Sequence, residues 1–465
     1  MSALWTAQEA AIATGSASRG AWSAKGVSID TRTLETGDLF VALKGEMRDG
    51  HEFVSAALAK SASAALVSRV PEGVAQDAPL LIVRDTQEGL EALGRAARAR
   101  TKARIVAVTG SAGKTTTKEM LRLMLGSVGK VAASAASYNN QWGVPLSLAR
   151  MDRATEFGVF EIGMNHEGEI RALARQVRPH VALITTVAPA HLEYFETVEA
   201  IADAKAEIFD GLEPGGTVIL PFDNPHFPRL MRRAEEAGIA DIRSFSVAEG
   251  ADARVLNASP SGAGQIVVAE IGGRKIEFAI AAAGAHIASN AVAALAAVHA
   301  LGVDPTQAAM ALKNFAPLKG RGARITHAGI EIIDESYNAN PASMSAALAL
   351  LGDAQLHGSA RRIAVLGDMR ELGAESAALH RALEHVISVN KIDLVFLCGR
   401  EMRALWNALP PQRRGAYAEN SASLAPEFLA QVRPGDAVLI KGSFASRMSV
   451  IVDALKAAEA AKQSA

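Results

Sequence analysis

The sequence predicts an α/β protein built from three domains. Short apolar runs alternate with longer, alanine-rich stretches of helical character along most of the chain, and strands that alternate with helices are typical of parallel sheets covered by helices. A length of 465 residues suits about three domains of roughly 100–200 residues each. The Lys/Gly/Arg-rich stretch PLKGRGAR at 317–324 indicates a linker. We therefore expect domains at 1–100, 101–319 and 320–465.

The first unit is expected to be a small α/β domain. Its short strand-like runs are Asp38–Leu43, Ala64–Val67 and Leu80–Val83. A basic, helix-like stretch from Glu91 to Arg104 then leads into the second unit.

The second and third units are each expected to hold a mostly parallel sheet, the third one Rossmann-like. Four apolar runs of the second unit are Ile105–Val108, Gly158–Ile162, Val181–Val187 and Thr217–Leu220. Those of the third unit are Ile330–Ile333, Ile363–Leu366, Leu394–Cys398 and Ala437–Ile440. Strands of this length between helical stretches favour βαβ units.

Bulk properties exclude several classes of protein. The formal net charge of −1 provides no general attraction for nucleic acid or an anionic membrane. The single cysteine, Cys398, permits no internal disulfide, which fits the reducing cytoplasm. The first 15 residues lack the basic and apolar regions of a signal peptide, and no apolar run reaches the 18 or so residues of a membrane span.

The clearest local motif is a phosphate-binding loop at 105–118, IVAVTGSAGKTTTK. A β-branched strand enters a glycine turn, and a helix follows. Glycines let backbone N–H groups curl around phosphate oxygens, and the helix N-terminus adds partial positive charge. Lys114 is expected to reach the β- and γ-phosphates, and the Thr115 hydroxyl to ligate Mg²⁺. The strict G-x-x-x-x-G-K-[ST] pattern is absent, since position 108 is valine, and the alternative is a chance Gly-Lys-Thr turn.

Three further residues follow successive strands of the same unit. Glu161 ends one strand, His191 follows the next, and Lys205 lies in a helix-like stretch shortly afterwards. The carboxyl ends of parallel strands form the rim where ligands bind, and Mg²⁺ prefers oxygen ligands. Each residue also has an ordinary explanation: a solvated strand end, a loop histidine and a surface lysine.

Several motifs together resemble the Mur ligase family over essentially the whole chain. They are TGSAGKTTTK (109–118), YNNQWGVP (138–145), EIG (161–163), AHL (190–192), DESYNANP (334–341) and AVLGDMRELG (364–373), with IDTR (29–32), GDLFVALKG (37–45) and DGH (49–51) near the N-terminus. Within that family the C-terminal motifs are similar to those of the enzymes that add D-alanyl-D-alanine to a UDP-N-acetylmuramoyl tripeptide.

This resemblance implies an ATP-dependent ligase with an acyl-phosphate intermediate and roles for individual residues. Residues 1–100 would bind the UDP-sugar, the central domain ATP, and the last domain would complete the site. The residues that the resemblance assigns to ATP are Gly110, Ser111, Ala112, Gly113, Lys114, Thr115, Thr116, Asn290, Arg321 and Asp334, the last for the ribose. Those assigned to two Mg²⁺ ions are Thr115, Glu161, His191 and Lys205, the lysine as a carbamate, and those assigned to the substrates are Thr31, Arg32, Asn139, Asn140, Tyr337, Asn338 and Asn340.

The asparagines of the YNANP run also support a dipeptide substrate on chemical grounds. Asn338 and Asn340 offer hydrogen-bond donors and acceptors without net charge. Such groups suit the amide and carboxylate of a short dipeptide. The alternative is a simple helix entry, with Asn340 as the N-cap and Pro341 at the first helical position.

Three positions depart from the family pattern. Ile287 stands where an asparagine commonly follows the histidine, Glu335 where a second aspartate is commoner, and Phe444 where an arginine often follows Lys-Gly-Ser. The contacts that those family residues make are therefore not carried over to this chain.

Three other activities remain open from the sequence, two of them ligases. One is a sister ligase that adds a single diamino acid to the UDP-muramoyl dipeptide; its Asp-Asn-Pro-Arg motif is absent here, because Asp223-Asn224-Pro225 lies in the middle domain and precedes His226. A folate polyglutamyl ligase is a further relative, but it fits the UDP-sugar-like N-terminus less well. The other class is a P-loop NTPase that works as a switch. We expect a cytoplasmic monomer.

Overall fold

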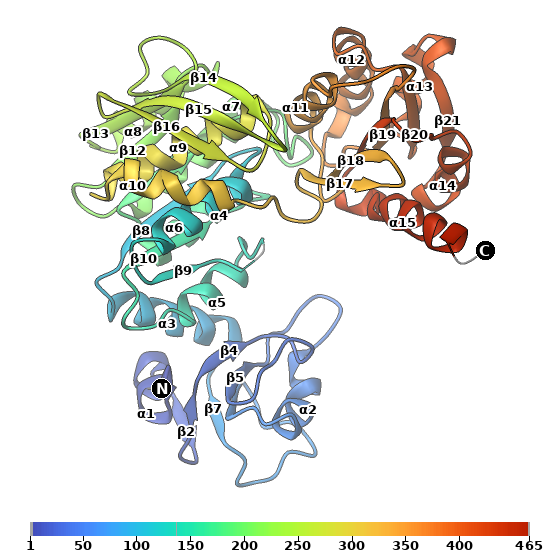
Figure 1. Cartoon of the computed structure of the whole chain (residues 1–465). Helices are drawn as coiled ribbons and strands as arrows, with labels where there is room; N and C mark the ends of the chain where they lie inside the picture. The colour runs from blue at the N-terminus through green and yellow to red at the C-terminus, as the bar shows by residue number, and fades with distance from the viewer. Residues whose placement is uncertain (1–2, 136, 464–465) are drawn as a thin grey trace.

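The computed structural model describes residues 3–135 and 137–463. Figure 1 shows three bodies in chain order: an N-terminal domain at the bottom, a central domain above it, and a C-terminal domain beside the central one. Each body contains its own sheet with helices packed against it. None of the helices within the described residues is long and apolar enough to cross a membrane.

The N-terminal domain is a small α/β unit, as expected. Its sheet has the order β2-β7-β6-β5-β4, parallel except for β2. The elements are β1 (Trp5–Thr6), α1 (Ala7–Thr14), β2 (Ala17–Arg19), β3 (Ser23–Ala24), β4 (Gly26–Ser28), β5 (Asp38–Val41), the 3-10 turn η1 (Gly50–Phe53), α2 (Val54–Ala59), β6 (Ala64–Val67) and β7 (Leu80–Ile82).

The connecting helix α3 (Thr86–Ala99) begins earlier than the basic stretch Glu91–Arg104 suggests. Asp85 is its N-cap, because its side chain accepts a hydrogen bond from the backbone N–H of Glu88, which satisfies an otherwise unpaired donor of the first turn. The C-terminal end of the expected helix is strand instead, since Arg104 starts β8 (Arg104–Thr109).

The central domain holds a long sheet of order β16-β15-β14-β13-β12-β11-β8-β10-β9. Its remaining elements are α4 (Lys114–Gly126), β9 (Val131–Ala133), α5 (Gly143–Ala149), β10 (Phe157–Glu161), α6 (Glu169–Val177), β11 (Val181–Ile184), α7 (Val198–Ala206), η2 (Glu207–Gly211), β12 (Thr217–Pro221), α8 (Phe227–Glu236), β13 (Asp241–Ser246), β14 (Ala253–Ser261), β15 (Gly264–Ile271), β16 (Arg274–Ile280), α9 (Ala285–Ala300), α10 (Pro305–Ala309) and η3 (Met310–Asn314). The four expected strands are β8, β10, β11 and β12.

An antiparallel extension of this sheet was not foreseen. Strands β14, β15 and β16 pair as two successive hairpins. The turns contain Gly262, Gly272 and Gly273, all with positive φ, a conformation that glycine adopts without steric cost. The mostly parallel sheet expected for this domain is therefore mixed at this edge.

The C-terminal domain has a sheet of order β17-β18-β22-β19-β20-β21, parallel except for β17. Its elements are β17 (Ala323–His327), β18 (Ile330–Glu335), α11 (Pro341–Gly352), β19 (Arg362–Gly367), η4 (Gly373–Glu375), α12 (Ser376–Val389), β20 (Leu394–Cys398), α13 (Arg403–Ala408), η5 (Pro411–Arg413), β21 (Arg414–Ala418), α14 (Ser421–Leu429), β22 (Ala437–Lys441), η6 (Phe444–Ser446) and α15 (Ser449–Gln463). The four apolar runs of the sequence coincide with β18, β19, β20 and β22.

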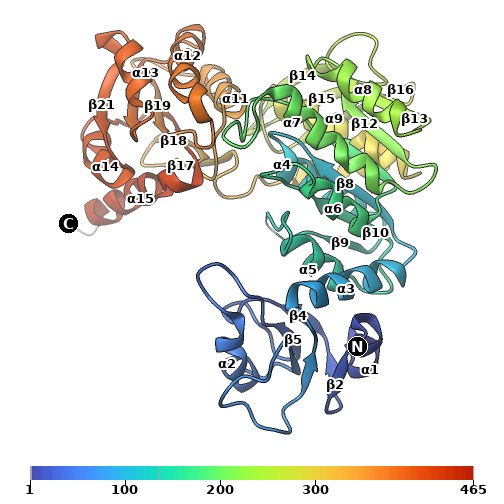
Figure 2. The same ribbon diagram turned by 180° about the vertical axis from the view of Figure 1, so that it is seen from behind.

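The N-terminal and central domains share one apolar core. Leu146 and Ala149 of α5 belong to the same buried cluster as Leu39, Leu90 and Leu93. Figure 2 shows α3 and α5 lying side by side between the two domains, and the Cα of Gly94 in α3 lies so close to Pro145 that a Cβ there would be 3.0 Å from its carbonyl oxygen. The junction is therefore packed like a protein interior.

Candidate active site

One cleft of about 950 Å³ is lined by residues of all three domains. Its walls include the phosphate loop, the ends of β10 and β11, and the segment that enters the C-terminal domain. The lining residues include Glu46, Ser111–Thr116, Asn139, Asn140, Glu161, His191, Asn224, His286, Ile287, Asn290, Arg321, Glu335, Tyr337, Asn338, Asn340 and Lys441.

The phosphate loop connects β8 to α4 and requires glycine at two positions. Gly110 has φ +149° and Gly113 has φ +82°. A Cβ on Gly110 would lie 1.9 Å from Thr185 Oγ1, and one on Gly113 would lie 2.9 Å from Asn290 Nδ2. Glycine at these two positions therefore lets the loop pass close to Thr185 and Asn290 at the start of a helix, the kind of place where anions bind.

Neighbouring strands hold this loop in shape. The backbone N–H of Ser111 donates to the carbonyl of Thr186 at 2.8 Å, and its hydroxyl donates to Ala188 O at 2.9 Å. Lys114 Nζ donates to Gly110 O at 2.7 Å. Burial lowers the pKa of Lys114, and the positive charge of Arg321 lowers it further while Glu161 opposes the shift. The lysine thus curls over the loop where a phosphate would sit.

Glu161 and Thr115 meet as expected. Thr115 Oγ1 donates to Glu161 Oε2 at 2.8 Å, and Asn139 Nδ2 donates to Glu161 Oε1 at 2.8 Å. The Glu161 carboxylate is 1% exposed and forms no ion pair with any described residue, so a buried negative charge lies beside the phosphate loop. Asn139, expected to contact substrate, holds this carboxylate in place.

His191 has a different neighbour from the one expected. Its Nδ1 lies 2.5 Å from Oε2 of Glu371 in the C-terminal domain, although the ring is not aligned for a regular hydrogen bond. This contact is the main reason that the pKa of Glu371 lies below its ordinary value. Within residues 3–135 and 137–463, no three His, Cys, Asp or Glu side chains gather as a ready-made metal cluster.

Lys205, on α7, is buried with 2% exposure and is not a surface lysine. Its side-chain amine forms no hydrogen bond or ion pair with the described part of the chain. Burial lowers the pKa of its amine well below the ordinary value, and the charge of Lys114 lowers it further. A buried lysine of this kind is uncharged for a larger fraction of the time and is more nucleophilic.

The segment between the domains brings three expected residues into the cleft. Arg321 Nη2 donates to Ser137 Oγ at 2.8 Å, and its guanidinium lies 3.9 Å above the ring of Tyr337. Asn340 accepts from the backbone N–H of Ser343 as the N-cap of α11. Its Nδ2 also donates to Ser111 O in the phosphate loop at 2.9 Å, so the capping role and a role at the site coexist.

Asp334, which is expected to hold the ribose of ATP, is not among the residues that line the cleft. It is fully buried, and its two carboxylate oxygens accept from Gly320 N at 3.1 Å and from the Ser336 hydroxyl at 2.6 Å. The next residue, Glu335, lines the cleft instead and pairs with Lys441 Nζ at 3.0 Å. Side chains alternate along a strand, so the two acids at the end of β18 face opposite ways.

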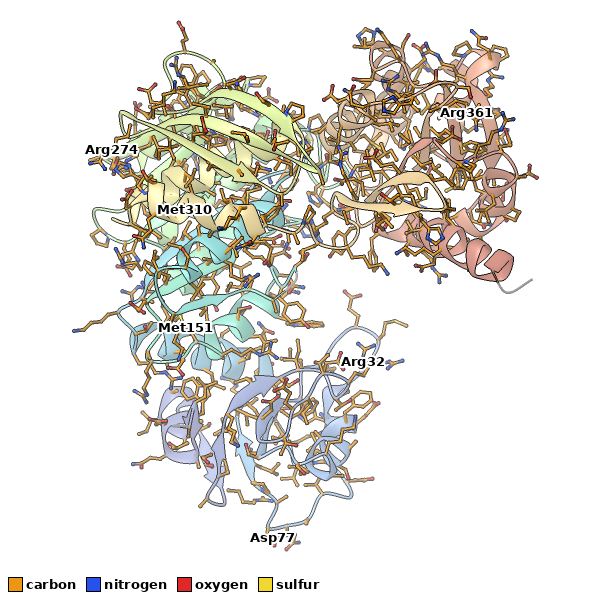
Figure 3. The ribbon with its side chains drawn as sticks, in the orientation of Figure 1. Arg32, Asp77, Met151, Arg274, Met310 and Arg361 are labelled. Atoms are coloured by element: carbon orange, nitrogen blue, oxygen red, sulfur yellow. The ribbon has the colours of Figure 1, made fainter. Side chains whose placement is uncertain are left out.

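The remaining expected residues are divided between two places. Asn140 and Asn338 line the cleft, as does Asn290, which packs against Gly113. Thr31 and Arg32 lie outside it. Figure 3 shows Arg32 on the N-terminal domain, on the side toward the C-terminal domain, where its guanidinium pairs with Asp30.

Several cleft residues were missed from the sequence. Asn224 donates to Thr186 Oγ1 and to Val187 O and therefore braces the rim. It follows β12, so the strand-end argument that selected Glu161 would have selected it as well. No local signal in the sequence indicated the contact of Glu371, because its partner His191 belongs to another domain.

Models of three Mur ligase domains match consecutive parts of the chain. They are described as Mur ligase family, catalytic domain (residues 23–101), Mur ligase middle domain (108–298) and Mur ligase, glutamate ligase domain (320–444). Together these matches extend over the phosphate loop, Glu161, His191 and the C-terminal motifs.

Similar proteins share the full length of the chain. A Rickettsia prowazekii protein named UDP-N-acetylmuramoyl-tripeptide--D-alanyl-D-alanine ligase is 32% identical, with 97% of this chain and 99% of the relative covered. MurF from Acinetobacter baumannii superposes with a TM-score of 0.86 at 30% identity, with 97% and 98% of the two chains covered. MurF from Thermotoga maritima, solved in complex with ADP, has a TM-score of 0.78 at 27% identity, with 93% and 97% covered.

Proposed function

The chain belongs to the Mur ligase family, and we propose that it joins D-alanyl-D-alanine to a UDP-N-acetylmuramoyl tripeptide with ATP as the energy source. The observation that carries this proposal is the convergence on one cleft of the phosphate loop, the Thr115–Glu161 pair, and Arg321 and Asn340 from the C-terminal side. The full-length relatives that carry this name support the choice of substrates.

The reaction proceeds in two steps. An oxygen of the tripeptide carboxylate attacks the γ-phosphorus of ATP, and the bond to the β-phosphate oxygen breaks to give an acyl phosphate and ADP. The dipeptide amine then attacks the acyl carbon, loses a proton, and expels inorganic phosphate as the amide forms. Lys114 and Arg321 are placed to neutralise charge on the transferring group, because such a reaction depends mainly on positioning and electrostatics.

The residues around Glu161 fit a divalent cation. Thr115 and Glu161 supply buried oxygen donors next to the phosphate loop, and Mg²⁺ prefers such donors. When bound there, Mg²⁺ would neutralise phosphate charge. Glu161 and His191 are the proposed ligands of a second ion.

Lys205 is the proposed site of a carbamate. Its uncharged amine would attack the carbon of CO₂, forming an N–C bond and releasing a proton to solvent. This converts a buried, unpaired amine into an oxygen ligand for the second cation. The structure gives the chemical reason: an ammonium at this position has no anionic partner in the described part of the chain.

We propose the domain bounds 1–100, 101–319 and 320–465. The remaining proposed ligand contacts are divided among these domains. Thr31 and Arg32 would hold the uridine diphosphate and Asn290 the adenine side of ATP. Asn140, Tyr337, Asn338 and Asn340 would contact the peptide substrates. We further propose that the enzyme acts in the cytoplasm as a monomer, since one chain supplies every wall of the cleft and its single cysteine is free and buried.

The test is ATP turnover with each substrate omitted in turn. Phosphate release should require both the UDP-muramoyl tripeptide and the dipeptide; release without them would indicate an NTPase switch. D-alanyl-D-alanine should be joined at least about tenfold better in kcat/KM than any single amino acid, a difference of roughly 1.4 kcal/mol or more in transition-state binding. A preference for a diamino acid on the UDP-muramoyl dipeptide would instead indicate the sister ligase.

A further inference from the structure

The GDMRELG motif at 367–373 lies in close contact with the central domain at the cleft rim. The backbone N–H of Glu193 donates to the carbonyl of Glu371 at 3.1 Å. The carboxylate oxygen Oε2 of Glu371 lies 2.5 Å from His191 Nδ1. A Cβ on Gly373 would lie 3.3 Å from Leu192 O, so this short loop lies directly against the loop that holds His191.

Both residues of the contact have an unusual backbone. His191 has φ +59° and Glu371 has φ +63°, in the left-handed region that residues with a side chain rarely adopt. Such a conformation is strained and persists where the surroundings enforce it, often at functional sites. Two of them on opposite sides of one contact indicate that the two loops have been shaped for each other.

The contact also has a specific chemical consequence for the histidine. An imidazole that binds a metal through one nitrogen usually donates its other ring N–H to a carboxylate or carbonyl, which sets the tautomer and the direction of the ring. Glu371 lies at Nδ1, so Nε2 is the nitrogen left for a metal. His191 lines the cleft, but the central domain supplies no carboxylate to its Nδ1 among the described residues.

We propose that Glu371 is a positioning residue, through which the C-terminal domain orients His191 for the second divalent cation. The proposal rests on the proposed function, because that function assigns the cation to His191. Its consequence is that the metal site is complete only when the C-terminal domain lies against the central one. The domain then controls metal binding as well as supplying Arg321 and Asn340.

The experiment measures divalent cation binding directly, with Mn²⁺ as the probe and a non-hydrolysable ATP analogue present. Electron paramagnetic resonance of free Mn²⁺ gives the number of bound ions and their affinities for the full chain. Glu371→Ala should weaken the second Mn²⁺ about 10- to 100-fold, the usual loss when such an outer carboxylate is removed. Glu371→Gln should lose less, because its amide oxygen can take the place of Oε2 beside Nδ1.

Two further variants separate positioning from a general structural effect. Glu375→Ala changes an exposed glutamate of the same segment and should leave both Mn²⁺ affinities unchanged. In a His191→Ala background, Glu371→Ala should cause no additional loss, because the residue acts through that ring. Thermal unfolding of every variant identifies any that fold poorly, and for those the Gln variant provides the comparison.

One set of results would refute the role of Glu371, and another would refute the assignment of the second cation. Equal Mn²⁺ affinity in the wild type and Glu371→Ala, or the same loss with and without His191, would refute the role of Glu371 while leaving the ligase assignment intact. A wild-type chain that binds the ATP analogue but no second Mn²⁺ would instead overturn the metal assignment in the proposed function.

Discussion

The central domain meets its two neighbours in opposite ways. Toward the N-terminal domain it contributes Leu146 and Ala149 to a shared apolar core, and Trp5 Nε1 donates to Ala149 O at 2.8 Å inside it. Toward the C-terminal domain the contacts are mainly polar, from Asn340 to Ser111, from Arg321 to Ser137 and from Glu371 to the His191 loop. Ala283 adds an apolar contact with the core of the C-terminal domain.

This contrast predicts that the apolar junction with the N-terminal domain is permanent and that the polar junction with the C-terminal domain opens. Apolar surface in a shared core is costly to expose, whereas hydrogen bonds at a wet interface exchange readily with water. The polar junction is also the site itself, because Ser111, Arg321 and Asn340 are proposed ligand contacts. We therefore expect substrate binding to replace the same contacts that hold the C-terminal domain, and so to couple domain movement to the reaction.

The largest effect is expected from Lys205→Ala. Loss of the carbamate would remove a ligand from the metal site, so activity should fall close to background while thermal stability is retained. Small carboxylates added to the assay should restore part of it by supplying oxygen ligands. Because the lowered pKa favours the neutral amine, acidification should protonate Lys205 and weaken the carbamate. Full activity in the alanine variant would contradict the assignment.

Lys114→Ala should lower kcat by roughly 10²-fold or more, the scale of removing one electrostatic contact to the transition state. Kinetics with both substrates at saturation would measure the loss. Lys313→Ala, at an exposed lysine of the same domain, is the control and should behave like the wild type. A folded Lys114→Ala enzyme with nearly normal kcat would remove the phosphate loop from the mechanism.

The two junctions should differ in stability when each is mutated. Leu146→Ala removes a fully buried side chain from the shared core and should lower the free energy of unfolding by about 2–5 kcal/mol. Arg321→Ala, at the polar junction, should change it by no more than about 0.5 kcal/mol while slowing ligation. Urea unfolding measures both, and equal destabilisation would show that the two junctions are alike.

The smallest expected change is in shape. Small-angle scattering of the chain with an ATP analogue and the UDP-tripeptide should show a smaller radius of gyration than the free protein, because a hinged domain closes around bound ligands. A variant such as Leu146→Ala tests the other junction under the same conditions. An unchanged radius on ligand addition would count against movement at the polar junction.

Local sequence patterns predicted much of the fold. Apolar runs bounded by turn residues located β8, β10, β11 and β12 and the parallel strands of the last domain, and the glycine loop located the phosphate site. Thr115 follows β8, and Glu161 ends its parallel neighbour β10. The sequence placed both residues near the ends of strands, and the pairing of these two strands brings them together.

The sequence did not predict features that depend on the direction of a side chain or on a contact with another domain. Asp334 and Glu335 are adjacent acids, and only the pleat of β18 determines which one faces the cleft. The hairpins of β14 to β16 were not predicted. They lie between α8 and α9, and a strand such as β16 alternates buried and exposed residues instead of forming one continuous apolar run. Glu371 could not be connected with His191, since 180 residues and a domain boundary separate them in the chain.

The shared core has a practical consequence for anyone who divides this protein into pieces. A gene fragment that ends near residue 100, where the first domain appears to stop, would leave out Leu146 and Ala149 and expose the faces of Leu90 and Leu93 that α5 covers. Apolar patches of this kind promote aggregation. The smallest stable expression product that contains the N-terminal domain should therefore extend through the central domain, whereas the C-terminal domain, with its own apolar clusters, is the piece suited to separate production.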